Sequence, residues 1–195
     1  EDQEIQSTDR YFTWGWTRKG CDTAAPMPAL KLVPWKKRRL GKQNGDLLAV
    51  YDAGHRYPYR IYSVPIAGQR LDDNQLQLSL LESLPVSLRK ALRLRIHPVP
   101  DGYGFREKIA ALGFAAQLDK SRTLMEAAKN ARLCIAANNS TSMLELLVSG
   151  VPTLVFYDTR LAEVREEAAP YFQALERVGI LFNDPQKLAA KIASV

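Results

Sequence analysis

Residues 131–158 read ARLCIAANNSTSMLELLVSGVPTLVFYD, and this stretch decides the fold class of the chain. An apolar run over residues 133–137 stops at four polar residues, NNST, at 138–141. A helical pattern follows, ends at Gly150, and gives way to a second apolar run over residues 153–157. The stretch therefore predicts a buried strand, a helix and a second buried strand. The polar residues at the first junction either cap the helix or hold an anion at its N-terminus.

The same alternation of strands and helices extends over residues 46–195. Apolar runs predict strands at residues 47–51, 92–96, 114–118, 133–137, 153–157 and 180–182. Helical spacing predicts helices at residues 70–84, 103–112, 122–130 and 161–178, with a break near Ala169 caused by Pro170, and a last helix that begins at Pro185. The strands are apolar on both faces, so we expect an α/β fold with a Rossmann-like doubly wound parallel sheet. Such sheets bind ligands beyond the carboxyl ends of their strands.

Residues 1–45 are expected to be irregular and to form an interdomain linker or extension. They hold all three tryptophans of the chain, Trp14, Trp16 and Trp35, so we expect the segment to pack against something. They also hold a basic run made up of Lys31, Lys36, Lys37, Arg38, Arg39 and Lys42. Two interpretations of the run stay open. Either Trp35 anchors it at a membrane or a missing domain, or Trp35 packs into this domain and the cations are solvated.

The chain of 195 residues has a net charge of +6, and a second basic cluster contains Arg89, Lys90, Arg93 and Arg95. Such clusters indicate a solvated face, a phosphate-bearing substrate or an anionic membrane surface. We expect no nucleic-acid partner, because no recognition module occurs in the sequence. No apolar stretch approaches the roughly 18–20 residues that span a bilayer, and the two cysteines form no disulfide framework. A cytoplasmic protein, peripheral at the inner membrane at most, is therefore expected.

Several catalytic classes lack their motifs in this sequence. There is no GxGxxG fingerprint, no GxxxxGK[ST] loop and no GxSxG elbow, which argues against dinucleotide oxidoreductases, P-loop NTPases and α/β hydrolases. Two cysteines and two histidines do not make a zinc site, so we expect no metal site.

Polar residues at the predicted strand ends are the candidates for binding. Asn139, Ser140 and Thr141 begin a helix, where unpaired N–H groups and hydroxyls can cradle a phosphate. Glu145 lies one turn further along the same helix face and can accept hydrogen bonds from ribose hydroxyls. As simpler alternatives, Ser140 or Asn139 caps the helix, and Glu145 is a solvated carboxylate.

Two more strand ends carry candidate residues. The stretch RIHP places Arg95 and His97 at the end of the strand over residues 92–96, and His97 can donate to a phosphate oxygen. Asp101 follows in the next turn. Asp52, His55 and Arg56 close the first strand as a further possible group, in which the planar guanidinium suits a phosphate or carboxylate. A surface histidine in a turn is the alternative for His97.

Together, HP at one strand end and NST at a later helix start resemble the motifs of bacterial GT-B transferases that use cytidine-nucleotide donors, such as Kdo transferases, sialyltransferases and polyol-phosphate transferases. Four segments more closely resemble the C-terminal half of a family of surface-carbohydrate and O-antigen biosynthesis transferases first noted in Leptospira. They are DRYFTWGW (9–16), PMPALKL (26–32), NSTSMLELLVSGVPTLVFYD (139–158) and APYFQALERVGILFNDPQKLAAKI (169–192).

The resemblance implies that residues 46–195 are the nucleotide-sugar-binding half of a GT-B glycosyltransferase, with a CMP-linked donor favoured and no other cofactor. Ser140 and Thr141 would hold the donor phosphate, His97 would assist, and Glu145 would contact ribose or brace the loop. The acceptor would be a lipid-linked saccharide or an oligosaccharide. The catalytic base would lie in a missing N-terminal domain, so we expect this chain alone to be inactive. The alternatives are a polyol-phosphate transferase, a nucleotide-sugar epimerase domain or a non-catalytic binding module.

Overall fold

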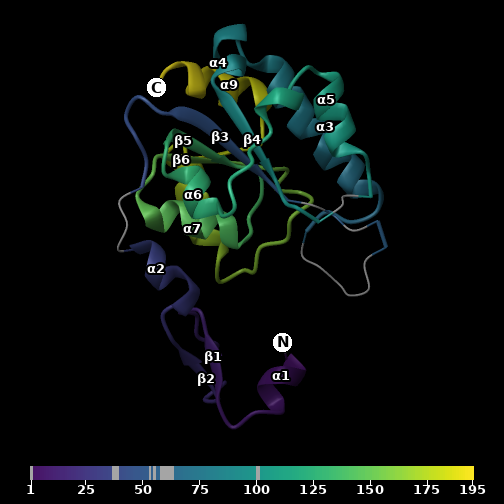
Figure 1. The fold of residues 1–195 in the computed structure, drawn as a ribbon. Helices are drawn as coiled ribbons and strands as arrows, with labels where there is room; N and C mark the ends of the chain where they lie inside the picture. The colour runs from purple at the N-terminus through teal and green to yellow at the C-terminus, as the bar shows by residue number, and fades with distance from the viewer. Residues whose placement is uncertain (1, 37–39, 53, 55, 58–63, 100–101) are drawn as a thin grey trace.

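The computed structural model describes residues 2–36, 40–52, 54, 56–57, 64–99 and 102–195. A five-stranded parallel sheet forms its centre, with the strand order β4-β3-β5-β6-β7 (Figure 1). The strands are β3 (Asp46–Tyr51), β4 (Leu92–Ile96), β5 (Ala131–Ala136), β6 (Thr153–Phe156) and β7 (Leu181–Phe182). The chain places β4 on one side of β3, and then β5, β6 and β7 on the other side. The strand order therefore reverses between β3 and β5. In open α/β sheets this switch point is where ligands bind.

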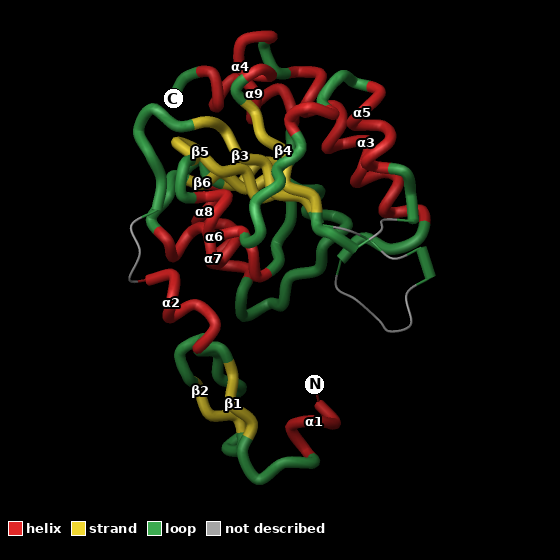
Figure 2. Tube along the Cα trace, in the orientation of Figure 1, coloured by secondary structure: helices red, strands yellow, loops and turns green. Residues whose placement is uncertain are grey.

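Helices cover both faces of the sheet, as the sequence predicts for a Rossmann-like doubly wound domain (Figures 1 and 2). One face carries α3 (Gly68–Ser83), α5 (Phe105–Ala111) and α9 (Pro185–Ala193). The other carries α6 (Leu124–Ala128), α7 (Thr141–Ser149) and α8 (Ala169–Arg177). Successive residues of β3 enter opposite cores, since Leu47 packs on the α3 face and Leu48 on the α7 face. This two-sided burial explains the near-continuous apolar run of that strand.

The edge strand β4 departs from the expected two-sided apolar pattern. Leu92, Leu94 and Ile96 are buried, but Arg93 and Arg95 point to the other face and are only partly buried. On that face Arg93 reaches α6, where it donates to the carbonyl oxygen of Ala127. Three residues of the second basic cluster have partners within the domain: Arg93 and Arg95 are ion-paired, and Arg89 donates to the carbonyl oxygens of Leu84 and Glu82.

Two predicted elements differ from the structure. Residues 114–118 are not a strand, because they form the 3-10 turn Ala115–Gln117 and a single bridge from Leu118 to Leu94. A short apolar run of this kind cannot be told from a buried turn by periodicity alone. The helix over residues 161–178 begins only at Ala169, and residues 161–168 form turns and irregular chain. Pro170 occupies the first turn, where its missing N–H costs nothing, so the expected break is the start of the helix. A further short helix, α4 (Val86–Lys90), leads into β4.

The N-terminal extension is more regular than the sequence predicts. It contains α1 (Asp2–Gln6), the parallel pair β1 (Tyr11–Thr13) and β2 (Ala24–Pro26), the 3-10 turn η1 (Leu30–Leu32) and α2 (Val33–Lys36). Figure 1 shows α1, β1 and β2 extending away from the sheet, while α2 lies nearer to it. Trp35 is only 6% exposed and belongs to the core on the α7 face. It packs into this domain, so the interpretation of Trp35 as a membrane anchor is wrong.

Lys37, Arg38 and Arg39 of the basic run lie outside the described residues. Of the helices in the described part of the chain, none combines the length and the apolar character needed to cross a membrane.

Candidate functional site

The loop between β5 and α7 is organised by Asn138, the first residue of the polar run NNST. The side-chain oxygen Oδ1 of Asn138 accepts from the N–H of Ser140 at 3.0 Å and from its hydroxyl at 2.6 Å. It also accepts from the hydroxyl of Ser142 at 3.1 Å. Asn138 is buried, so these bonds hold the loop in one conformation. Ser140 takes the N-cap position but its side chain forms no capping bond, so capping by Ser140 does not explain the polar run.

A cavity of about 320 Å³ opens in front of this loop, at the switch point of the sheet. Its lining residues come from the ends of three strands, from the starts of α6 and α7 and from the N-terminal extension. They are Lys31, Val50, Tyr51, Asp52, Arg95, His97, Pro98, Leu124, Asn138, Ser140, Thr141, Ser142 and Glu145. The N–H groups of Thr141 and Ser142 belong to the first turn of α7, where a helix offers no internal acceptor and carries a partial positive charge. The cavity therefore places backbone donors and hydroxyls around a space that suits an anion.

Arg95 brings a fixed positive charge to the cavity. Its Nη1 donates to Asp119 Oδ2 at 2.7 Å and to the carbonyl oxygen of Ser121 at 2.8 Å. Within the described residues no other atom of its guanidinium group has a hydrogen-bond partner. Since Arg95 also lines the cavity, one edge of the guanidinium is held by Asp119 and the other can serve a ligand.

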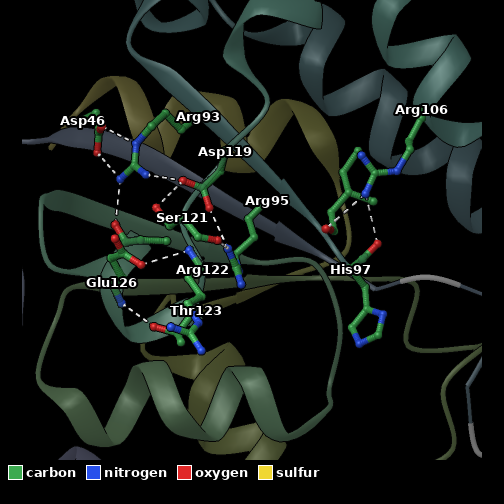
Figure 3. A network of polar contacts seen from close by, with 12 residues as sticks. Asp46, Arg93, Arg95, His97, Arg106, Asp119, Ser121, Arg122, Thr123 and Glu126 are labelled. Carbon is green, nitrogen blue, oxygen red and sulfur yellow. Dashed lines mark hydrogen bonds and ion pairs between the residues drawn. The ribbon is translucent and has the colours of Figure 1, made fainter. Parts of the chain in front are cut away.

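Asp119 forms ion pairs with both Arg93 and Arg95 and so fixes the position of Arg95 (Figure 3). Arg93 donates to Asp119 Oδ1 at 2.7 Å, forms an ion pair with Asp46 and donates to the carbonyl oxygen of Ala127. The Asp119 side chain is 2% exposed. Burial raises the pKa of this carboxyl group, but the hydrogen bonds from Ser121 and Arg95 and the charge of Arg93 outweigh it, so the pKa lies below its ordinary value. Asp119 is therefore ionised, and its charge fixes both arginines.

His97 follows β4 directly and lines the same cavity. Its ring is exposed, and Figure 3 shows it pointing away from Arg106, which donates to the carbonyl oxygen of His97 at 3.1 Å. The ring nitrogen Nδ1 accepts from the N–H of Val99 at 3.3 Å. This contact leaves the proton of the neutral ring on Nε2, so Nε2 is available as a donor.

Glu145 is buried to 9% exposure and its carboxylate lies 3.6 Å from the ammonium group of Lys31. The interpretation of Glu145 as a solvated helix carboxylate is therefore wrong. Lys31 comes from η1 in the extension, more than a hundred positions away in sequence, and is itself exposed. The ion pair partly neutralises a carboxylate that would otherwise repel an anion in the cavity.

Asp52 also lines the cavity, and it connects to a second polar group on α3. Its Oδ2 lies 3.9 Å from Nη2 of Arg70, whose Nη1 donates to Asp73 at 3.2 Å. Arg70 and Asp73 are both 5% exposed, and burial is the main reason why the pKa of Asp73 lies above its ordinary value. These residues hold the end of β3 against α3.

The structure brings most of the sequence-predicted residues together and leaves some aside. Arg95, His97, Ser140, Thr141, Glu145 and Asp52 all line the cavity, whereas Asn139 and Arg56 are not among its lining residues. Arg56 stacks on the ring of Tyr57 at 5.9 Å instead. His55 and Asp101 lie outside the described residues.

Sequence reasoning missed Lys31 and Ser142 as members of the site. Ser142 directly follows the NNST run, so the signal was the length of the polar stretch, which one helix cap does not require. Lys31 carried no such signal beyond its place in the basic run, because only the folding of the extension against α7 brings it to the cavity.

Comparison with known protein families assigns the chain to a family of transferases. The model of the LIC12162 family transferases matches residues 1–195. The chain belongs to that transferase family. Its reaction class is therefore group transfer. No curated protein matches the chain.

Proposed function

We propose that this chain is the donor-nucleotide-binding domain of a glycosyltransferase of bacterial cell-surface polysaccharide assembly, with a CMP-linked sugar as the favoured donor. The observation that carries the proposal is the cavity of about 320 Å³ at the switch point, where the start of α7, three hydroxyl side chains and two cationic side chains converge. The preference for cytidine rests on the resemblance of the HP and NST stretches to transferases that use such donors.

In this proposal the donor phosphate lies at the N-terminus of α7. The N–H groups of Thr141 and Ser142 and the hydroxyl of Thr141 face it, because they begin the helix and line the cavity. Arg95 and Lys31 add positive charge, and Nε2 of His97 adds a donor. These groups are held before the substrate arrives, so they stabilise the charge that grows on the departing phosphate without further reorganisation.

The carboxylates of Glu145 and Asp52 have a separate role in this proposal. An anionic phosphate does not bind next to an unpaired carboxylate, but Lys31 lies 3.6 Å from Glu145 and Arg70 lies 3.9 Å from Asp52. Paired in this way, each carboxylate keeps lone pairs for ribose hydroxyl groups. The two cations therefore allow one cavity to hold both the phosphate and the sugar of a nucleotide. The catalytic base is not assigned.

Isothermal titration of the chain with CMP, CDP and UDP tests the proposal. We expect binding of cytidine nucleotides with clear preference over UDP. A preference for UDP would favour the nucleotide-sugar epimerase alternative instead. If no nucleotide binds, the chain is a binding module and the proposal is wrong.

A matched pair of lysines tests the site itself. Lys31 lines the cavity, whereas Lys36 belongs to the same basic run but not to the lining, and both side chains are exposed. We expect Lys31→Met to weaken nucleotide binding about tenfold, which corresponds to about 1.4 kcal/mol for one charge-assisted contact. Lys36→Met should bind as the unchanged chain does. Equal effects of the two substitutions would show that only the overall charge matters and would place the phosphate elsewhere.

A further inference from the structure

The stretch TWGW, residues 13–16, contributes nothing to the nucleotide cavity, yet it lines a pocket of its own. A hollow of about 370 Å³ lies between the N-terminal extension and helices α7 and α8. Four aromatic residues line it, Trp14, Trp16, Tyr171 and Phe172, together with the charged residues Arg165 and Glu167. Its volume lies in the range of about 300–1,000 Å³ that is typical of small-ligand sites.

The local structure of the extension shapes this pocket. Gly15 has a φ of +94°, which a residue with a side chain adopts only with strain, so the chain can turn sharply between the two tryptophans. The buried Thr13 fixes the turn, because its hydroxyl donates to the carbonyl oxygen of Trp16 at 2.5 Å. On the opposite wall, the guanidinium group of Arg165 lies 5.3 Å from the ring centre of Trp16, which ties the extension to the segment before α8.

The lining of the pocket has two chemical characters. Most of its surface is formed by aromatic rings and aliphatic carbon atoms. Of these residues, Trp14 is 52% exposed and Tyr171 is 75% exposed. Large aromatic side chains left open to water at a concave site indicate a ligand surface. Arg165 and Glu167 at the same pocket offer donors and acceptors to a ligand that also carries hydroxyl groups. An acyl chain would use the rings but would form no hydrogen bond with Arg165 or Glu167.

We propose that this pocket binds a pyranose ring of a carbohydrate. One face of a pyranose consists of C–H bonds that pack against an aromatic ring, and its edge carries hydroxyl groups that hydrogen-bond to charged side chains. The aromatic residues and the pair Arg165 and Glu167 match these two parts of the ligand. A monosaccharide ring also fits the volume of the pocket.

The position of the pocket relates it to the nucleotide cavity. Leu144 lines the aromatic pocket and Glu145, the next residue of α7, lines the nucleotide cavity. Successive residues of a helix point in directions about 100° apart, so the two sites lie on adjoining sides of the same helical turn. In a transferase, a second substrate must reach the donor, and a sugar in this pocket would lie beside it. This role as an acceptor subsite rests on the proposed function, whereas sugar binding itself does not.

The three tryptophans give the test its readout. Each contributes one indole N–H signal to a ¹H–¹⁵N spectrum; two line the pocket, and Trp35 lies in the core as an internal control. The probes are the methyl pyranosides of glucose, galactose, mannose and N-acetylglucosamine, added without nucleotide at concentrations of the order of 10 mM because such small ligands bind weakly. We expect saturable shifts of Trp14 and Trp16 with at least one of them and none of Trp35.

Substitutions assign the binding to the pocket. Trp14→Ala and Tyr171→Ala should each weaken the saturable shift of the Trp16 signal about three- to tenfold, as expected for one lost aromatic contact. The matched control is Phe12→Ala, because Phe12 is an aromatic residue of β1, 61% exposed and two positions before Trp14, that does not line the pocket. It should leave the shift unchanged.

Three results would overturn the proposal: no shift of Trp14 or Trp16 with any pyranoside, equal shifts of all three indoles, or equal losses in Phe12→Ala and Trp14→Ala. A shift caused by detergent micelles of dodecylphosphocholine and by none of the sugars would also overturn it, in favour of a lipid. Because the titration contains no nucleotide, its failure leaves the nucleotide cavity untouched, and a failure to bind nucleotide leaves the sugar shift standing.

Discussion

Among single residues, Asn138 explains most about the candidate site. Its buried side-chain oxygen accepts three hydrogen bonds and orders the loop that begins α7. The hydroxyl of Ser140 is engaged by Asn138 and is therefore not the best candidate for a ligand contact. Thr141 lines the cavity, and its hydroxyl makes no hydrogen bond to the described residues, so it is the hydroxyl best placed to bind a ligand.

We expect Thr141→Val to lower nucleotide affinity about tenfold or more, because the change removes one hydrogen bond to a charged phosphate and keeps the shape of the side chain. The free energy of unfolding should change by no more than about 0.5 kcal/mol, as is usual away from the core. Calorimetric titration and urea denaturation measure the two quantities. Thr141→Ser, which keeps the hydroxyl, is the control and should bind normally. A Val variant that binds as tightly as the Ser variant would contradict the role of Thr141.

Among elements, α7 connects the site to the fold. It begins at the cavity, buries Met143 and Leu146 in the core, and ends at Gly150. Gly150 has a φ of +76°, the left-handed conformation that commonly ends a helix. Since α7 lies between β5 and β6, its C-terminal turn determines where the chain re-enters the sheet.

Gly150→Ala should destabilise the chain by about 1–2 kcal/mol, because an L-residue is strained in the left-handed region. Apart from the chain neighbours of Gly150, no atom of the described residues lies within 4 Å of the added methyl group, so the cost comes from the backbone conformation. Gly68→Ala is the control, since that position also has open space but shows no positive φ, and it should be neutral or slightly stabilising. Thermal unfolding compares the two variants. Similar melting temperatures would show that the end of α7 tolerates another conformation.

At the scale of the whole molecule, parts of the extension contact the domain that contains the sheet. Trp35 of α2 lies in the core on the α7 face, Lys31 of η1 reaches Glu145, and Trp16 contacts Arg165. Both the cavity at the switch point and the aromatic pocket therefore take part of their lining from residues that precede β3. The segment that looks like a linker in the sequence contributes to both candidate sites.

Trp35→Ala should destabilise the chain by about 3–5 kcal/mol, the usual cost of removing a large aromatic side chain from a core. Trp14→Ala removes the same side chain from a site that is 52% exposed, and it should cost far less. Urea denaturation followed by circular dichroism at 222 nm measures both without relying on tryptophan fluorescence. A small effect of Trp35→Ala would mean that the extension does not pack against the sheet in solution.

The sequence alone determined the parallel sheet, four of the five strand positions almost to the residue, and the polar strand ends that meet at the switch point. These features depend on local patterns: apolar runs of strand length, the glycine after α7 and the proline that starts α9. The strand predicted at residues 114–118 is wrong because a short apolar run also suits a buried turn. The helix predicted at residues 161–168 is wrong because a helical pattern also suits an irregular segment.

Only the tertiary structure decided which distant residues complete the site. Lys31 reaches Glu145, Asp119 holds Arg93 and Arg95, and Trp35 enters the core rather than a membrane. Each of these contacts joins segments that are far apart in the chain or on different elements. Their formation depends on how α2, β4 and α7 pack, because the residues next to a side chain in the sequence do not indicate which distant residue it will contact.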